Sequence, residues 1–120
     1  STYEEEGGCH AMGRLLGQTR RPTAIAVWSL GAAIGAMAAA RRGGLRLPDD
    51  LSIVAFHDAP LAAYLDPPLT TVQMALGEMG ARAVDLLLDL ISGTPARSTV
   101  IDAPPQLVVR GSTAPPAGAP

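Results

Sequence analysis

The chain has 120 residues and a formal net charge of −2, and all nine of its basic residues are arginine. This slightly acidic balance argues against a nucleic-acid-binding surface, which would show clustered positive charge. A single cysteine, Cys9, excludes an internal disulfide and a cysteine-based zinc cluster. The N-terminus does not resemble a signal peptide, and no uninterrupted apolar run reaches membrane-spanning length. We therefore expect a soluble protein of a reducing compartment.

The first half of the chain alternates helix and strand. Residues 4–18 predict a helix with glutamates in its first turn, where they complement the helix dipole. The apolar run 23–28 predicts a short strand covered on both faces. Residues 30–42 predict a helix of small side chains, in which Gly31, Gly35 and Ala39 recur at four-residue spacing and allow close approach to a neighbour. A second buried strand is expected over 51–56.

The second half of the chain contains a brief strand over 69–72 and then the most clearly patterned helix, Leu76–Ile91. One face of this helix is an apolar stripe, made of Met79, Ala83, Leu86, Leu87 and Leu90. Two short runs, 98–102 and 106–110, predict terminal strands, and residues 111–120 predict a disordered tail. The alternating order implies an α/β fold with right-handed crossovers and a parallel sheet faced by helices.

Polar side chains follow the two central strands of the predicted sheet. Ser29 comes after Trp28 at the end of the first strand, and His57 and Asp58 end the second. Parallel strands bring their carboxyl ends to one edge, where ligands of open α/β sheets bind, so these residues are candidate ligand contacts. Two alternatives stay open. Trp28 either stacks on a ligand or fills the core, and the His-Asp pair either contacts a ligand or is the polar end of a buried strand.

Catalysis by these residues is disfavoured. With His57 as base and Asp58 as its orienting group, a nucleophile would be needed, and neighbours at a strand end point in opposite directions. Ser29 is near but lacks the context of a nucleophile elbow. Cys9 and His10 have no partner cluster for a metal, and the glycine pairs lack phosphate-loop spacing. We therefore expect no catalytic, metal or cofactor site, and an esterase using Ser29 and His57 is the unlikely alternative.

The chain contains "RLPDDLSIVAFHD", then "DPPLTTV", then the helix text "EMGARAVDLLL" and finally "LVVRGST". Together these stretches closely resemble the C-terminal half of LacI/GalR-type bacterial transcriptional regulators. The opening "STYEEEGGCHAMGRLL" is similar to the segment that precedes it in the family. The match extends over nearly the whole chain. The resemblance implies a periplasmic-binding-protein-like fold of two Rossmann-like lobes, and this chain would supply the C-terminal lobe, a Rossmann-like three-layer parallel sheet.

The resemblance also implies an effector, commonly a sugar or nucleobase, in the cleft between the lobes of a cytoplasmic homodimer. Operator DNA would be bound by a helix-turn-helix that this chain lacks, along with most of the N-terminal lobe. Residues 1–72 would then be the lobe core, 73–96 a crossover helix that packs on the N-terminal lobe, 97–110 strands returning to the lobe and 111–120 the tail. A transport-type periplasmic sugar-binding protein is the alternative, although "DPPLTTV" and "LVVRGST" match the regulators better.

The functional residues of the family carry over unevenly. Tyr3 matches the aromatic residue that stacks on the effector ring. Ser29 and Leu30 stand where the family usually has Asn and Asp, and His57 stands where an Asp hydrogen-bonds the effector, while Asp58 matches the family's second Asp. A carboxylate accepts two hydroxyl hydrogens, whereas neutral imidazole offers one donor and one acceptor. The usual sugar-hydroxyl clamp is thus weakened, and we expect an atypical effector that is anionic, aromatic or absent.

Two apolar surfaces are expected to be covered. By the resemblance, Ile34, Tyr64, Leu65 and Pro67 match positions that pack across the two-fold axis of a dimer, and ordinary packing within the chain is the alternative. The helix Leu76–Ile91 would belong to the N-terminal lobe, which leaves its leucine stripe without a cover of its own. Because faces of that size do not stay exposed, we expect another copy or the chain's own lobe to bury it.

Overall fold

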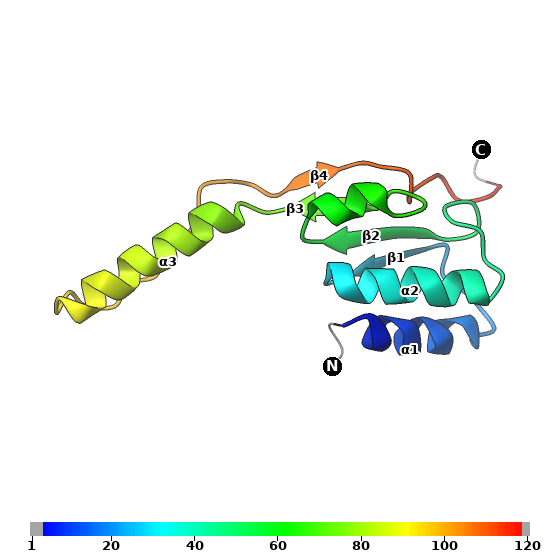
Figure 1. The fold of residues 1–120 in the computed structure, drawn as a ribbon, viewed down its shortest axis with the longest axis horizontal. Coiled ribbons are helices and arrows are strands. Elements are labelled where there is room, and N and C mark those ends of the chain that lie inside the picture. The colour runs from blue at the N-terminus through cyan, green and yellow to red at the C-terminus, as the bar shows by residue number, and fades with distance from the viewer. Residues whose placement is uncertain (1–3, 119–120) are drawn as a thin grey trace. The chain divides into compact units, whose positions relative to one another are not determined.

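The computed structural model describes residues 4–118. Its elements follow in the order α1 (Glu5–Leu16), β1 (Ala24–Val27), α2 (Leu30–Arg42), β2 (Ser52–Phe56), the 3-10 helix η1 (Pro60–Tyr64), β3 (Thr70–Gln73), α3 (Leu76–Ile91) and β4 (Gln106–Val108), as Figure 1 shows. All three predicted helices and the first three predicted strands are confirmed in position, with shifts of a residue or two at their ends. The expectation that the first strand is covered on both faces is wrong, because Ala24 and Ala26 of β1 are exposed and only Ile25 and Val27 are half-buried. Among the described residues, no helix is both long enough and apolar enough to cross a bilayer.

The chain divides into two compact units. The first runs to Gln73 and resumes at Leu107, and it contains α1, α2 and the first three strands. The second is Met74–Gln106 and contains α3. Residues 97–106 therefore group with α3, whereas the sequence placed them with strands that return to the lobe.

The sheet has the strand order β1-β2-β3-β4. β2 pairs in parallel with β1 on one side and with β3 on the other, and Val27 lies opposite Ala55 while Phe56 lies opposite Val72. The expected α/β fold with a parallel sheet is confirmed. Because β1 and β2 run in the same direction, Val27 and Phe56, their last residues, end at the same edge of the sheet.

The core lies between α2 and the sheet. Alanines from α2, together with Met37, pack against Leu51, Ile53 and Leu69, all of which are buried. α1 packs closely on α2, and glycines make the approach possible: a Cβ on Gly8 would collide with the backbone of Ala32. The four-residue spacing of small residues predicts that α2 approaches a neighbour closely. This is confirmed at Gly35, where a Cβ would meet the backbone of Glu5.

Two expectations for the C-terminal region are wrong. Residues 98–102 form no strand, and Val100 is 91% exposed, so this run finds no surface against which to bury its apolar side chains. The disordered tail does not begin at residue 111, because Ser112 is fully buried. The Ser112 hydroxyl donates to the carbonyl oxygen of Ile53 at 2.6 Å and accepts from the amide of Thr70 at 2.8 Å. A short hydroxyl side chain thus anchors this segment to β2 and β3.

Candidate ligand site at the carboxyl edge of the sheet

The edge at which β1 and β2 end carries an exposed aromatic side chain. Trp28 follows directly after β1 and is 68% exposed, so the alternative in which it fills the core is wrong. Its ring packs on that of Phe56, the last residue of β2, with 4.4 Å between the ring centroids and 35° between the planes. The parallel register explains this contact, because it brings the two strand ends side by side. The sequence motif "VW" therefore presents an indole at the edge where α/β sheets bind ligands.

Ser29 has a structural task at this edge. It is the N-cap of α2, and its Oγ accepts a hydrogen bond from the amide of Ala32 at 3.1 Å. Serine is among the residues preferred at this position, because its oxygen satisfies one of the unpaired amides of the first turn. The turn between β1 and α2 is thereby fixed on the C-terminal side of Trp28. The serine that the sequence offered as a ligand contact is thus also a helix cap.

His57 is presented to solvent by an unusual backbone conformation. Its φ of 70° lies in the left-handed region, which residues other than glycine seldom adopt. Its amide still donates to the carbonyl oxygen of Val72 at 3.1 Å, so the chain leaves the sheet immediately after this last ladder contact. The imidazole is exposed. Strained backbone of this kind occurs often at ligand contacts and supports such a function for His57.

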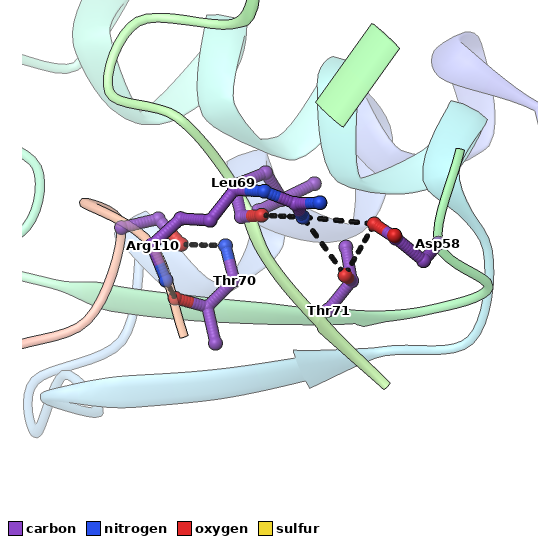
Figure 2. Close-up of polar contacts among 6 residues, drawn as sticks. Asp58, Leu69, Thr70, Thr71 and Arg110 are labelled. Carbon is purple, nitrogen blue, oxygen red and sulfur yellow. Dashed lines mark hydrogen bonds and ion pairs between the residues drawn. The ribbon is translucent and has the colours of Figure 1, made fainter. Parts of the chain in front are cut away.

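Asp58 points into a polar network instead (Figure 2). Its Oδ1 accepts a hydrogen bond from Thr71 Oγ1 at 2.7 Å and pairs with the Arg110 guanidinium at 2.8 Å, and both charged side chains are largely buried. The same guanidinium donates to the carbonyl oxygen of Leu69 at 2.8 Å. The hydrogen bonds from Arg110 and Thr71 hold the pKa of the Asp58 carboxyl below its ordinary value. The charge of Asp58 is therefore compensated within the protein.

The carboxylate beside His57 is held by other side chains. A base at His57 would need an orienting carboxylate, and the neighbouring Asp58 is engaged by Arg110 and Thr71. Between residues 4 and 118, no three His, Cys, Asp or Glu side chains are grouped to hold a metal ion. Cys9 accepts a hydrogen bond from Arg42 at 2.9 Å. These contacts are those of a folded scaffold with an exposed ring and an exposed imidazole at one edge.

A cavity of about 420 Å³ lies beside this edge. Trp28 and Ser29 line it together with glycines and apolar side chains of α1, β1 and α2, among them Gly7, Gly8 and Met12. Tyr3, which the sequence assigned to effector stacking, lies outside the described residues. Among the described residues, Trp28 and Ser29 thus line the same cavity. His57 directly follows Phe56, the residue on which Trp28 stacks.

Comparison with known proteins assigns the chain to a family. A model of the periplasmic binding protein-like domain matches residues 1–113. The transcriptional regulator MalR of Streptomyces coelicolor is 49% identical over 114 residues, and the repressor PurR of Pasteurella multocida is 36% identical over 110. The crystal structure of a LacI family transcriptional regulator from Mycobacterium smegmatis superposes with a TM-score of 0.88 at 40% identity. The chain belongs to the periplasmic binding protein-like family, as the C-terminal region of a LacI/GalR-type regulator.

The 120 residues of this LacI-type chain align with only part of each relative. The MalR alignment covers 95% of it and 33% of MalR, and the PurR alignment covers 92% and 33%. Among solved structures, it covers 44% of the Mycobacterium smegmatis protein. A dimeric Lac repressor matches with a TM-score of 0.78 at 33% identity, over 94% of this chain and 41% of that one. The chain therefore spans about a third of the curated relatives that it matches.

The residues assigned to a dimer face differ in their exposure. Tyr64, at the end of η1, is 84% exposed, whereas Ile34, Leu65 and Pro67 are half-buried. Leu61, one turn before Tyr64, is also exposed. The LacI-type chain thus presents a tyrosine and a leucine on a short helix, where they are free to contact another surface.

Sequence reasoning missed Arg110. The sequence predicts it as the last residue of the strand 106–110, yet in this LacI-type chain it binds Asp58 and the carbonyl oxygen of Leu69. A contact between residues so far apart along the chain leaves no local pattern in the sequence. One available signal was that Asp58 closely follows a buried strand, because a carboxylate buried there needs a partner.

Proposed function

We propose that this chain is the effector-binding and dimerisation region of a DNA-binding transcriptional regulator. The observation that carries the proposal is the carboxyl edge of the sheet, where an exposed indole, a helix-capping serine and an exposed imidazole follow two neighbouring parallel strands. The names of the relatives, which include transcriptional regulators and repressors, support the same function. No observation favours the transport-type binding protein.

The effector is a sugar-like small molecule that contacts Trp28, Ser29 and His57, and its binding is atypical because Ser29 and His57 replace residues of the usual sugar-hydroxyl clamp. His57 can donate one hydrogen bond and accept another when neutral, so it suits a ligand with both kinds of polar atom. Asp58 serves the site indirectly, because its contact with Arg110 fixes the loop that follows His57. Tyr3 precedes α1 and completes the set of candidate contacts.

The regulator senses its effector and does not transform it. Binding changes the function of such a protein when the effector has different affinities for two conformations. The same free-energy coupling then links effector and operator, so that each changes the affinity for the other by an equal factor. In this mechanism the chain described here supplies half of a cleft, and the lobe that precedes it in the relatives supplies the rest.

The partners follow from this assignment. The full-length regulator is a cytoplasmic homodimer, and Ile34, Tyr64, Leu65 and Pro67 contribute to the contact between its subunits. Operator DNA is bound through a helix-turn-helix that lies outside these 120 residues. α3 has no buried residue, so the expectation that the chain's own lobe buries the apolar stripe is wrong. In the full-length protein the stripe is covered by the N-terminal lobe or by another copy.

Operator binding by the full-length protein tests this function. Genomic DNA fragments selected by the purified protein provide the operator, and fluorescence anisotropy then measures its affinity with and without candidate sugars. We expect one compound to change the operator affinity, and calorimetry to show that His57→Ala weakens binding of that compound. Loss of operator binding altogether, or an operator affinity that no small molecule changes, would contradict the proposal.

A further inference from the structure

We infer that Arg110 is a positioning residue that couples the ligand edge of the sheet to the contact between subunits. The inference rests on the proposed function and adds a route by which the two surfaces influence each other. His57 of the ligand edge and Tyr64 of the subunit contact lie on one segment, residues 57–69, which we call the edge loop. His57 begins this loop, and Tyr64 ends η1 in its middle. Whatever fixes the edge loop therefore fixes both surfaces.

Arg110 joins the two ends of the edge loop, as Figure 2 shows. Its Nη1 pairs with Oδ1 of Asp58, the second residue of the loop, at 2.8 Å. The same nitrogen donates to the carbonyl oxygen of Leu69, the last residue of the loop, at 2.8 Å. A further contact, with Thr71 Oγ1 at 3.0 Å, ties this nitrogen to β3. One nitrogen atom thus holds both ends of the loop against the sheet.

The guanidinium is itself held in place. The side chains of Arg110 and Asp58 are only 18% and 16% exposed, so salt screens their attraction less than it would at the surface. The Arg110 amide donates to Thr70 Oγ1 at 2.9 Å, which fixes the arginine backbone beside β3. A Cβ on the next residue, Gly111, would lie 3.2 Å from Cδ of Pro68, so the chain after Arg110 runs along the edge loop. Arg110 is therefore fixed to the sheet more firmly than a surface arginine would be.

One end of the edge loop connects Arg110 to η1. Ala62 of η1 is fully buried, and its carbonyl oxygen accepts a hydrogen bond from the amide of Leu69 at 2.8 Å. Leu69 is also the residue whose carbonyl oxygen binds Arg110. Tyr64 follows Ala62 by two residues within the same short helix. A shift of Leu69 after loss of Arg110 would therefore reach Tyr64 through this hydrogen bond.

The other end of the edge loop connects Arg110 to His57. The His57 φ of 70° is an uncommon conformation, which persists only where the surrounding structure holds it. Asp58 is the next residue, and its contacts with Arg110 and Thr71 supply that hold. Without Arg110 the His57 backbone is free to relax, which would turn the imidazole. A change at either surface then alters the other, and the free energy of this coupling is the same in both directions.

Sedimentation equilibrium and hydrogen exchange on the full-length regulator test the inference. Arg110→Ala should weaken the dimer about tenfold, although the Arg110 side chain is largely buried among residues of its own chain. Exchange measured by mass spectrometry should become faster over residues 57–69, because the loop opens more often. Asp58→Asn removes the ion pair without leaving a buried acid unpaired, and it should change both quantities in the same direction.

A conservative variant provides the rescue. Nη1 alone makes the contacts with Asp58, Leu69 and Thr71, and a lysine ammonium offers three N–H donors at one nitrogen. Arg110→Lys should therefore retain most of the dimer affinity and most of the exchange protection over residues 57–69. Arg110→Gln has a similar polar side chain without the charge, and it should behave as Arg110→Ala does.

Coupling between the surfaces has its own measurement. In the wild type, dilution below the dimer dissociation constant should speed exchange of the His57 amide, which is bonded to the carbonyl oxygen of Val72. In Arg110→Ala, exchange of this amide should be fast at both concentrations. A residue that only stabilised the fold would not make the exchange of His57 depend on dimerisation.

Two control variants separate positioning from general loss of stability. Leu51→Ala truncates a fully buried side chain just before β2, so it should lower the thermal midpoint without weakening the dimer. Arg46→Ala removes a more exposed arginine–aspartate pair, with Asp50, and should change neither dimer affinity nor exchange over residues 57–69.

Several results would overturn the inference. They are a wild-type dimer affinity in Arg110→Ala, a loss no larger than that in Leu51→Ala, and exchange of the wild-type His57 amide that dilution leaves unchanged. Operator binding by the wild-type protein, and its response to candidate sugars, report separately on the proposed function.

Discussion

At the scale of single residues, Arg110 connects the C-terminal strand region to the ligand edge. Its guanidinium contacts Asp58, Thr71 and the carbonyl oxygen of Leu69, and its amide donates to Thr70 Oγ1 at 2.9 Å. Hydrogen bonds that involve charged groups are stronger than neutral ones. The loop that begins at His57 is therefore anchored from a segment far away in the sequence.

The first expected outcome concerns this pair and its response to acid. The folded-state pKa of Asp58 is lowered, so the unfolded chain binds the proton more readily. The stabilisation from Asp58 is present above the ordinary Asp pKa of about 3.9 and is lost as the pH falls through the lower, folded-state value. Arg110→Ala should reduce the free energy of unfolding by about 2 kcal/mol at neutral pH.

Urea unfolding across this pH range measures both effects. In Asp58→Asn the free energy of unfolding should fall less steeply as the pH is lowered than it does in the wild type. Asp102→Asn, at an exposed carboxylate, is the matched control. An unchanged acid slope in Asp58→Asn, together with a wild-type free energy of unfolding in Arg110→Ala, would show that the pair does not stabilise the fold.

Ser112 gives a second residue-scale outcome. It is fully buried, and its hydroxyl satisfies the amide of Thr70 and the carbonyl oxygen of Ile53. Ser112→Ala leaves both backbone groups without this partner, which should cost about 1–3 kcal/mol of unfolding free energy. Ser98→Ala, at an exposed serine, should change it little. Equal midpoints for the two variants in chemical denaturation would contradict the anchoring of this segment.

At the scale of elements, the contact between α1 and α2 depends on glycine. A Cβ on Gly35 would meet the backbone of Glu5, whereas a Cβ on Gly13 of α1 would meet nothing. Backbone cannot move aside as a side-chain tip can. Substitution by alanine should therefore have opposite effects on stability at the two glycines.

Gly35→Ala should destabilise the chain by about 1–3 kcal/mol or more, because overpacking forces the helices apart. Gly13→Ala should stabilise it by up to about 1 kcal/mol, because alanine is the better helix former. Thermal unfolding followed by circular dichroism compares the two. A Gly35→Ala midpoint at or above that of Gly13→Ala would mean that the helices do not pack as closely as described.

The same elements show what sequence alone could predict. The helices Leu30–Arg42 and Leu76–Ile91 were predicted to the residue, because small-residue and apolar periodicity and terminal glycine or serine are local signals. The run 98–102 was predicted as a strand from composition, but a strand needs a neighbour that local pattern does not reveal. The buried Ser112 was missed for the same reason, since its partners lie on β2 and β3.

The ligand edge was predictable in part. The order of strands brought Trp28 and His57 to one edge, as parallel topology requires. The exposure of Trp28 and the pairing of Asp58 with Arg110 were not predictable, because both depend on side-chain contacts between distant segments. Asp58 stays a predicted ligand contact, and the structure adds that its carboxylate has internal partners in Arg110 and Thr71.

At the scale of the whole molecule, the proposed dimer depends on η1. Tyr64 is 84% exposed, and aromatic side chains often dominate the energetics of interfaces. In the full-length protein, Tyr64→Ala should weaken dimerisation by about 2 kcal/mol. Sedimentation equilibrium measures the change, with Val109→Ala as the control of similar exposure. If wild type and Tyr64→Ala dimerise with the same affinity, η1 is not part of the interface.

The central claim is that a small molecule binds at the carboxyl edge of the parallel strands. Amide chemical-shift mapping of the full-length regulator, titrated with its effector, tests this claim most directly. We expect the largest shifts at Trp28, Ser29 and His57. Shifts confined to the opposite edge, at Thr23 and Leu51 where the strands begin, would contradict it.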